Sequence, residues 1–390
     1  MSAAPAENWK RGACPTLAAP MATGDGLLAR LRLPSGLITP DDLAYLANLA
    51  RRHGNGLIEI TARGNLQVRG LSALSSTVFA DAVERHIAIE DGLVVDTSPI
   101  AGDDPSERAD PLPLVNAIRE GSRPLWPLLA PKLSVVIDGN GQFPLSALKA
   151  DIRLLALGAE LWQVQIGNGT PREFLADEAI TTTLDTLQRL AALGPQARAA
   201  DLASAPAASS ARTMENTRPI GRFQRRAGTS TGIALPFAAS DAESLGDLAR
   251  RASSAGVKTL RLAPGHALLI DDAPAELVTA AKGLGFITHA DDPRLRVSAC
   301  AGSDGCRSGR IASRRLAAQL APRVDPGAHL HVSGCPKGCA HPAPAPLTIV
   351  GLDDGVGLVI DGRAGDTPQT RVGLDGIEAV LECTHRQEGR

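Results

Sequence analysis

Four of the six cysteines in this chain lie between residues 300 and 339, in two tight pairs. Five residues separate Cys300 from Cys306, three separate Cys335 from Cys339, and 28 lie between the pairs. Thiolates are soft ligands that suit iron–sulfur clusters and zinc. Structural zinc sites use spacers of roughly two to four residues. The longer spacer and the flanking glycines therefore favour one iron–sulfur cluster on these four cysteines, with zinc second.

The alternative of four buried free thiols is weak, because chance would not gather four of six cysteines into two glycine-rich pairs. Cys14 and Cys383 lie outside the pattern and are expected to be structural. His331 and His341 flank the second pair. We expect each to hydrogen-bond beside the metal rather than to ligate it.

Composition restricts the other function classes. The chain has 390 residues, enough for two or three domains, and a net charge of −2, which gives no general attraction to nucleic acid or an anionic membrane. No apolar run approaches the ~20 residues of a membrane span, and the first residues lack a secretory signal. We therefore expect a cytoplasmic protein.

The chain repeats one pattern. Residues 27–33 alternate in polarity, residues 39–53 read as a helix and residues 57–70 as a strand; residues 231–270 follow the same order. Both helices carry the tetrad Leu-Ala-Arg-Arg, and plausible caps precede them at Thr39 and at Ser240–Asp241. A longer α/β segment follows each copy, and in the second one the strand-like runs end at the cysteines. The pattern predicts an α+β protein of two pseudo-symmetric halves, joined by a mobile linker rich in Ala, Ser and Arg.

The segment 63–69 presents alternating polar side chains. On a single strand Arg63, Asn65, Gln67 and Arg69 would share one face. Two guanidinium groups around two amides suit a ligand with several carboxylates, although a solvated strand face is the commoner explanation. The second copy has no arginine at these positions, whether Gly265 is matched to Arg63 or to Gly64. One ligand site between unequal halves explains that loss. Arg30, Arg32 and Lys132 are further basic candidates.

Together, these features resemble the sulfite and nitrite reductase superfamily over residues 27–365. The resemblance rests on the strand Thr61–Arg69, the segment Pro131–Ile137 and the four cysteines. It implies that each half is a ferredoxin-like unit followed by a larger reductase-type segment. It also implies a [4Fe–4S] cluster on the cysteines, with Cys339 in the position that bridges to sirohaem iron. Arg32, Arg63 and Lys132 match residues that bind the tetrapyrrole carboxylates. The expected division is 20–88, 89–193, a linker at 194–219, 220–290 and 291–390.

Within the superfamily, three features resemble an oxygen-dependent branch that modifies a tetrapyrrole as its substrate. They are the signature Ser333–Pro342, the segment Asp96–Pro105 and a short chain. Two basic residues of the reductases are also missing, one from Gly92–Asp96 and one at Ser134. The implied reaction is hydroxylation and lactone formation on precorrin-3A in aerobic cobalamin biosynthesis. The alternatives are a sirohaem-dependent sulfite or nitrite reductase and a non-catalytic metal-binding module.

The implied cofactors and partners follow from this chemistry. Dioxygen needs a metal or flavin that passes electrons singly, so a mononuclear non-haem iron is a candidate beside the cluster. Sirohaem belongs only to the reductase alternative. Gly24-x-Gly26 precedes a strand and so does not form a dinucleotide site. Electrons are therefore expected from an external reductase. The sequence assigns no catalytic residue.

Overall fold

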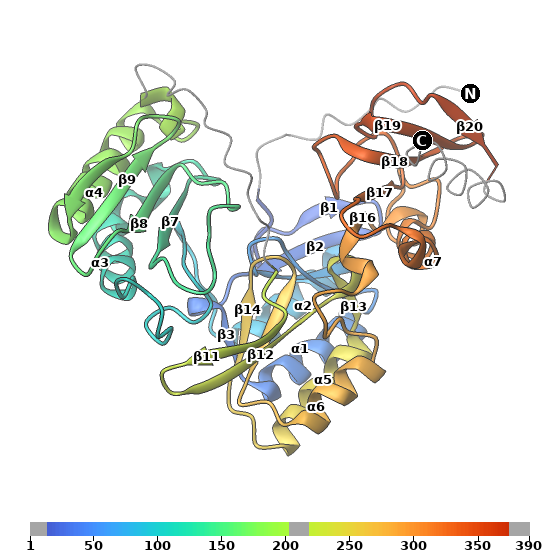
Figure 1. Ribbon diagram of the computed structural model, residues 1–390, viewed down its shortest axis with the longest axis horizontal. Coiled ribbons are helices and arrows are strands. Elements are labelled where there is room, and N and C mark those ends of the chain that lie inside the picture. Colours follow the sequence, from blue (N-terminus) through green and yellow to red (C-terminus); the bar gives the residue numbers. More distant parts are fainter. Residues whose placement is uncertain (1–13, 203–217, 374–390) are drawn as a thin grey trace.

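The computed structural model describes residues 14–202 and 218–373. It is a mixed α+β fold with four five-stranded sheets. In Figure 1 two of the sheets and their helices form a base, from which a green lobe and a red lobe rise on opposite sides. No helix in the described ranges is long and apolar enough to cross a membrane.

The two sheets of the base exchange their last strands. The first contains, in spatial order, β1 (Met21–Thr23), β2 (Gly26–Leu31), β5 (Leu66–Leu71), β4 (Leu57–Ile60) and β13 (Ala239–Asp241). The second contains β11 (Gly221–Arg225), β12 (Gly228–Ala234), β15 (Ala267–Asp271), β14 (Leu260–Ala263) and β3 (Leu37–Ile38). Each sheet thus ends in a strand from the other part of the chain, and the two units are joined through backbone pairing.

The helices of the base build one common core. They are α1 (Pro40–His53), α2 (Ala73–Glu84), α5 (Ala242–Ser254) and α6 (Ala275–Gly283). The expected caps are present: Thr39 accepts from the Asp42 N–H at 3.1 Å and Asp241 from the Ser244 N–H at 2.7 Å. The apolar faces of α1 and α5 are buried in a core shared by both sheets.

Two segments expected to be single strands are hairpins. Residues 57–70 bend at Thr61–Asn65 between β4 and β5, and the second copy bends between β14 and β15. Gly64 and Gly265 each have φ +80°, a left-handed conformation that suits glycine and ends the strand. The turns contact each other, because the Gly265 N–H donates to the Ala62 carbonyl at 3.1 Å.

The lobes contain the other two sheets. The third sheet runs β10 (Arg172–Leu175), β9 (Leu161–Ile166), β8 (Ile152–Ala156), β7 (Ser134–Asp138) and β6 (Val94–Asp96), with α3 (Leu112–Ser122) and α4 (Ala176–Leu193). The fourth runs β16 (Val297–Ala299), β17 (Leu330–Ser333), β18 (Ala345–Leu352), β19 (Gly355–Gly362) and β20 (Thr370–Val372), with α7 (Ser313–Leu320). In each sheet three parallel strands are followed by two antiparallel ones. The same strand arrangement in both sheets is what a repeated unit would give. The internal repeat and the domain boundaries remain predictions from the sequence.

Short 3₁₀ helices join these elements. They are Pro34–Gly36, Arg123–Leu128, Ala199–Leu202, Pro236–Ala238, Pro293–Arg296, Gly302–Asp304 and Ala321–Arg323. The prediction of a mobile linker at 194–219 is wrong for the first part of this range. Arg198 pairs with Asp151 at 2.8 Å and Ala199 is fully buried, so this stretch packs on the green lobe. Residues 203–217 lie outside the described ranges.

Val68 offers a test of the common core, because it lies on β5 and is 0% exposed. Val68→Ala removes two buried methyl groups and should destabilise the protein by roughly 2 kcal/mol. Val78→Ala is the matched control, since Val78 is 46% exposed on α2 and its loss should change stability by less than about 0.5 kcal/mol. Thermal unfolding of both variants checks this, and equal midpoints would contradict the placement of Val68 in the core.

Candidate functional site

The fold brings both cysteine pairs to one edge of the fourth sheet. β16 and β17 are adjacent and parallel, with Ala299 opposite Val332. Cys300 follows β16 directly, and Cys335 comes two residues after β17 ends. The carboxyl ends of parallel strands meet at one edge of a sheet, where open α/β sheets usually bind their ligands. The sequence prediction that strands end at the cysteines is confirmed.

The two cysteine loops are locked together by glycines. A Cβ on Gly334 would lie 2.8 Å from the Gly302 Cα, so neither loop has room for a side chain at this contact. Gly302 also has φ +62°, which suits glycine. The close approach lets the Gly334 N–H donate to Cys300 Sγ at 3.2 Å. N–H groups directed at thiolates are a common means of tuning a metal centre.

The four thiols lie in one electrostatic neighbourhood. Cys300, Cys306 and Cys335 are half-buried and Cys339 is exposed as a residue. Burial of its sulfur raises the pKa of Cys339, and the charges of the other three cysteines raise it further. Four thiolates that repel one another would be stabilised by bound iron, so the donor set fits an iron–sulfur cluster. No three His, Cys, Asp or Glu side chains within 14–202 and 218–373 meet as ligands of a single ion.

Three histidines lie beside the second cysteine loop. The His329 and His341 rings are 4.8 Å apart, and those of His331 and His341 are 5.6 Å apart. Burial, aided by the charge of His341, lowers the pKa of His329 and of His331 to about 4, so both are neutral at pH 7. Neither ring nitrogen of His331 has a partner among the described residues, because strand β17 holds this side chain in the protein interior, whereas His341 Nε2 lies 3.3 Å from the Pro344 carbonyl oxygen.

Arg63 turns toward the green lobe. Its guanidinium donates to Asp96, to the Lys149 carbonyl and, at 3.4 Å, to Ser134 Oγ. Burial raises the pKa of Asp96, and the charge of Arg63 opposes that rise. A hollow of about 60 Å³ beside this pair brings together the predicted residues Arg32, Arg63 and Asn65.

The other predicted members of the basic face point elsewhere. Gln67 accepts from Arg30 at 2.7 Å and donates to Glu59 at 2.9 Å. Arg69 pairs with Asp25 at 2.7 Å and lies 3.6 Å from Glu59. The prediction that all four side chains share one strand face is wrong, because the turn at Thr61–Asn65 interrupts the strand before β5 begins. Lys132 is exposed and lines neither of the two hollows that we describe.

Arg69 instead joins the base to the first cysteine loop. It donates to the Gly305 carbonyl at 3.2 Å, next to Cys306. Burial raises the pKa of Asp25, but hydrogen bonds from Arg69 and Thr23 more than offset it and hold the pKa below its usual value. Glu59 also pairs with Arg314 of α7. This network could not be predicted from the sequence, because Glu59 is a single charged residue in an apolar run and its partners are distant in the chain.

The structure also shows the surroundings of Gly24 and Cys14. Gly24 lies in the turn before β2, and a Cβ there would be 2.0 Å from the Arg307 backbone nitrogen. This close contact with the first cysteine loop accounts for the glycine that resembled a nucleotide motif. Cys14 is close enough to Arg30 to influence its pKa, and Cys383 lies outside the described residues.

Comparisons with known proteins agree with this architecture. Residues 19–74 match the nitrite/sulfite reductase ferredoxin-like half domain. The fold is similar to that of the Mycobacterium tuberculosis NirA protein, with a TM-score of 0.70 at 18% identity over 92% of this chain and 80% of that one. A precorrin-3B synthase from Sinorhizobium sp. is 39% identical over 95% of this chain and 87% of its own length. The chain belongs to the precorrin-3B synthase family.

A reductase is a more distant relative of this precorrin-3B synthase family member. The ferredoxin–nitrite reductase of Synechococcus elongatus is 24% identical over 87% of this chain and 80% of its own length. Two segments that the sequence analysis singled out meet at one arginine, because Asp96, the last residue of Gly92–Asp96, and Ser134 both contact Arg63.

Arg69→Met tests the link between base and cysteine loop. The change leaves Asp25 and Glu59, 8% and 9% exposed, without their shared cation. Breaking such a pair should cost roughly 3 kcal/mol and lower the thermal midpoint. Arg52→Met is the control, because Arg52 is exposed on α1 and its replacement should leave the midpoint within about 2 °C. Equal midpoints for the two variants would show that Arg69 is not part of a stabilising network.

Proposed function

We propose that this protein converts precorrin-3A to precorrin-3B by oxygen-dependent hydroxylation and lactone formation. The observation that carries the proposal is the 39% identity with a precorrin-3B synthase over 95% of the chain. In the balanced reaction one atom of dioxygen enters the substrate and the other leaves as water, with two electrons and two protons. The electrons come from an external reductase, which agrees with the absence of a nucleotide motif from the sequence.

We propose that Cys300, Cys306, Cys335 and Cys339 hold one [4Fe–4S] cluster. Four soft donors at one sheet edge and an N–H already directed at Cys300 support this assignment. When bound, the cluster supplies single-electron transfer. The chain's own contribution is to fix the two loops against each other through Gly302 and Gly334, and against the base through Arg69.

A second, mononuclear iron stays a proposal without assigned residues. No three His, Cys, Asp or Glu side chains in the described ranges are close enough to hold this iron. Its ligands would therefore have to come together when the iron binds. His329 and His331, beside the second loop, offer neutral nitrogens, and each has at least one buried nitrogen without a partner in the part of the chain that the structure describes.

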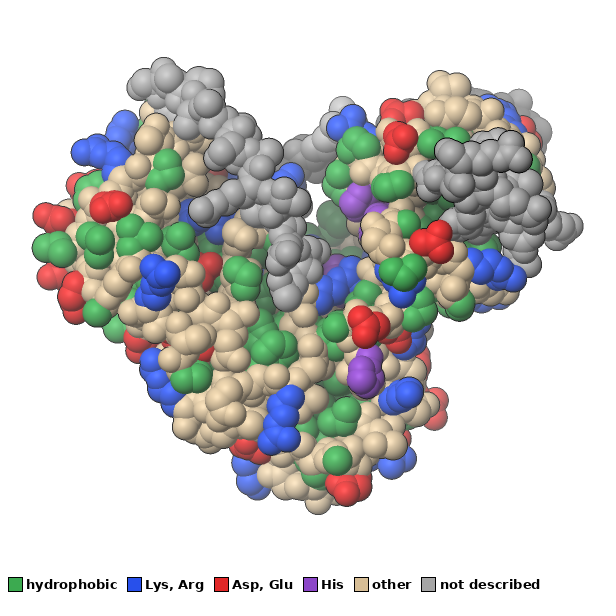
Figure 2. All heavy atoms as spheres, viewed as in Figure 1, with side chains coloured by type: hydrophobic (Ala, Val, Ile, Leu, Met, Phe, Trp, Pro, Cys, Tyr) green, Lys and Arg blue, Asp and Glu red, His purple; other side chains and the backbone are tan. Residues whose placement is uncertain are grey.

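For the tetrapyrrole we propose Arg32, Arg63 and Asn65 as binding residues, and the exposed Lys132 as a further one outside the two hollows. Arg32 is already held in place, since it donates to the Glu90 and Gly92 carbonyls at 3.2 and 2.9 Å. Arginines fixed in this way orient a carboxylated ligand, and orientation counts for much when one bridge carbon must be hydroxylated. Gln67 and Arg69 are assigned to the scaffold instead. Figure 2 shows the hollow between the two lobes, with basic side chains at its floor.

The rival activity is sirohaem-dependent reduction of sulfite or nitrite. The similarity of the fold and the 24% identity with a nitrite reductase support this alternative. The contact of Asp96 with Arg63 opposes it, because a buried carboxylate placed there competes with the carboxylates of a permanently bound cofactor. Fewer free cations suit a tetrapyrrole that enters and leaves as substrate.

The reaction itself is the test. Protein with a reconstituted cluster, an external reductant and labelled dioxygen should convert precorrin-3A to a product one oxygen atom heavier that carries the label. The reaction should stop without oxygen, and Cys335→Ala should abolish it. Full turnover under strict anaerobiosis would contradict the proposal, as would efficient reduction of sulfite or nitrite by the same preparation.

A further inference from the structure

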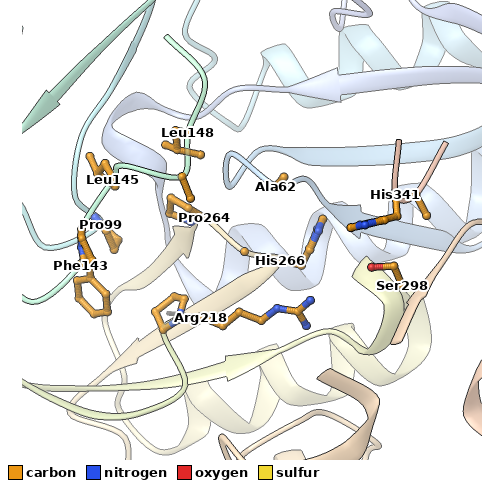
Figure 3. Close-up of a pocket in the computed structure, with 15 residues that line it drawn as sticks. Ala62, Pro99, Phe143, Leu145, Leu148, Arg218, Pro264, His266, Ser298 and His341 are labelled. Atoms are coloured by element: carbon orange, nitrogen blue, oxygen red, sulfur yellow. The ribbon is translucent and has the colours of Figure 1, made fainter. Parts of the chain in front are cut away.

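A larger hollow lies where four parts of the chain meet. Its volume is about 240 Å³. Figure 3 shows Arg218 and His266 facing it from the second sheet's unit, with Phe143 on one side and Ser298 and His341 on the other. Ala62, from the turn before β5, closes it. Because His341 comes two residues after Cys339, this hollow adjoins the second cysteine loop.

Arg218 differs from the other arginines around it. Burial lowers the pKa of its guanidinium, and no carboxylate in the described ranges pairs with it. Burial lowers the pKa of His266 and of His329, and the charge of Arg218 lowers both further, so neither ring supplies a negative charge. His266 Nδ1 is already hydrogen-bonded to the Ile60 carbonyl at 2.6 Å. A cation that is partly removed from water and has no anion beside it is costly, so this position fits an anionic ligand.

The two hollows are neighbours, because Pro99 and Pro264 line both. The smaller hollow contains Arg63, whose charge is balanced by Asp96. The larger one contains Arg218, whose charge is not balanced by any described residue. The turns that hold Gly64 and Gly265 contact each other, and Gly64 lines the smaller hollow and Gly265 the larger. A ligand that reaches both hollows would have one paired and one unpaired arginine to bind its acidic groups.

We propose that Arg218 binds a carboxylate side chain of the tetrapyrrole, as a second anchor opposite Arg63. The ligand class rests on the proposed function; the need for an anion rests on the geometry around Arg218. At about 240 Å³ the hollow is below the roughly 300–1,000 Å³ of a site for a whole drug-sized ligand. It therefore takes one edge of the macrocycle with its acidic arm, held bidentately. That anchor would place the macrocycle against Ala340 and His341, beside the cysteine loop.

Fluorescence titration with uroporphyrin III, a tetrapyrrole with eight carboxylates, tests this proposal on the full chain. Arg218→Gln should weaken binding roughly ten- to a hundredfold, the effect of losing a charged hydrogen bond. Arg218→Lys keeps the charge but loses the bidentate fork, and should weaken binding several-fold. Arg222→Gln is the matched control: Arg222 is an exposed arginine four residues on, and its loss should leave binding unchanged.

Stability without ligand separates a binding role from a structural one. If Arg218 awaits an anion, Arg218→Gln should keep or raise the thermal midpoint, because it removes an unpaired buried charge. A lower midpoint with parent-like binding by both variants would overturn the proposal and leave the proposed function standing. Binding of inorganic phosphate but not uroporphyrin by the parent would also overturn it, in favour of a small-anion site. If the parent binds neither probe, this proposal fails together with the tetrapyrrole site.

Discussion

An arginine removed from water needs an acceptor, and this constraint organises the centre of the molecule. Arg69 is the clearest case, because one guanidinium joins Asp25, Glu59 and the Gly305 carbonyl. Those three acceptors come from the first sheet and from the first cysteine loop. Arg314 then ties α7 to the same Glu59. Without these pairs the red lobe would lose several of its polar contacts with the base, and the cysteine loop its fixed position.

The same constraint applies to two arginines of the proposed tetrapyrrole site. Arg63 pairs with Asp96 and contacts Ser134, so its positive charge is balanced within the protein. Arg218 has no such partner among the described residues, and it keeps its charge for a ligand. A site with one balanced and one unbalanced arginine favours an acidic ligand that binds and leaves.

Local features of the fold could be predicted from the sequence. The caps at Thr39 and Asp241 and the strands that end at Cys300 and Cys335 depend on neighbouring residues, and they are confirmed. The hairpin turns were missed because Gly64 and Gly265 lie within segments that read as continuous strands. The strand exchange and the partners of Arg69 depend on contacts between distant residues, which periodicity does not encode. Arg218 was hidden at the end of a stretch that resembled a linker.

We propose that this protein holds an iron–sulfur cluster on its four paired cysteines and receives a tetrapyrrole as substrate. The absorption spectrum of the protein purified without oxygen tests both parts at once, together with iron and acid-labile sulfide analysis. We expect a broad shoulder that colours the protein brown, about four iron and four sulfide per chain, and no porphyrin-type bands in the spectrum. Intense porphyrin-type bands from stoichiometric sirohaem would contradict the substrate role, and zinc without sulfide would contradict the cluster.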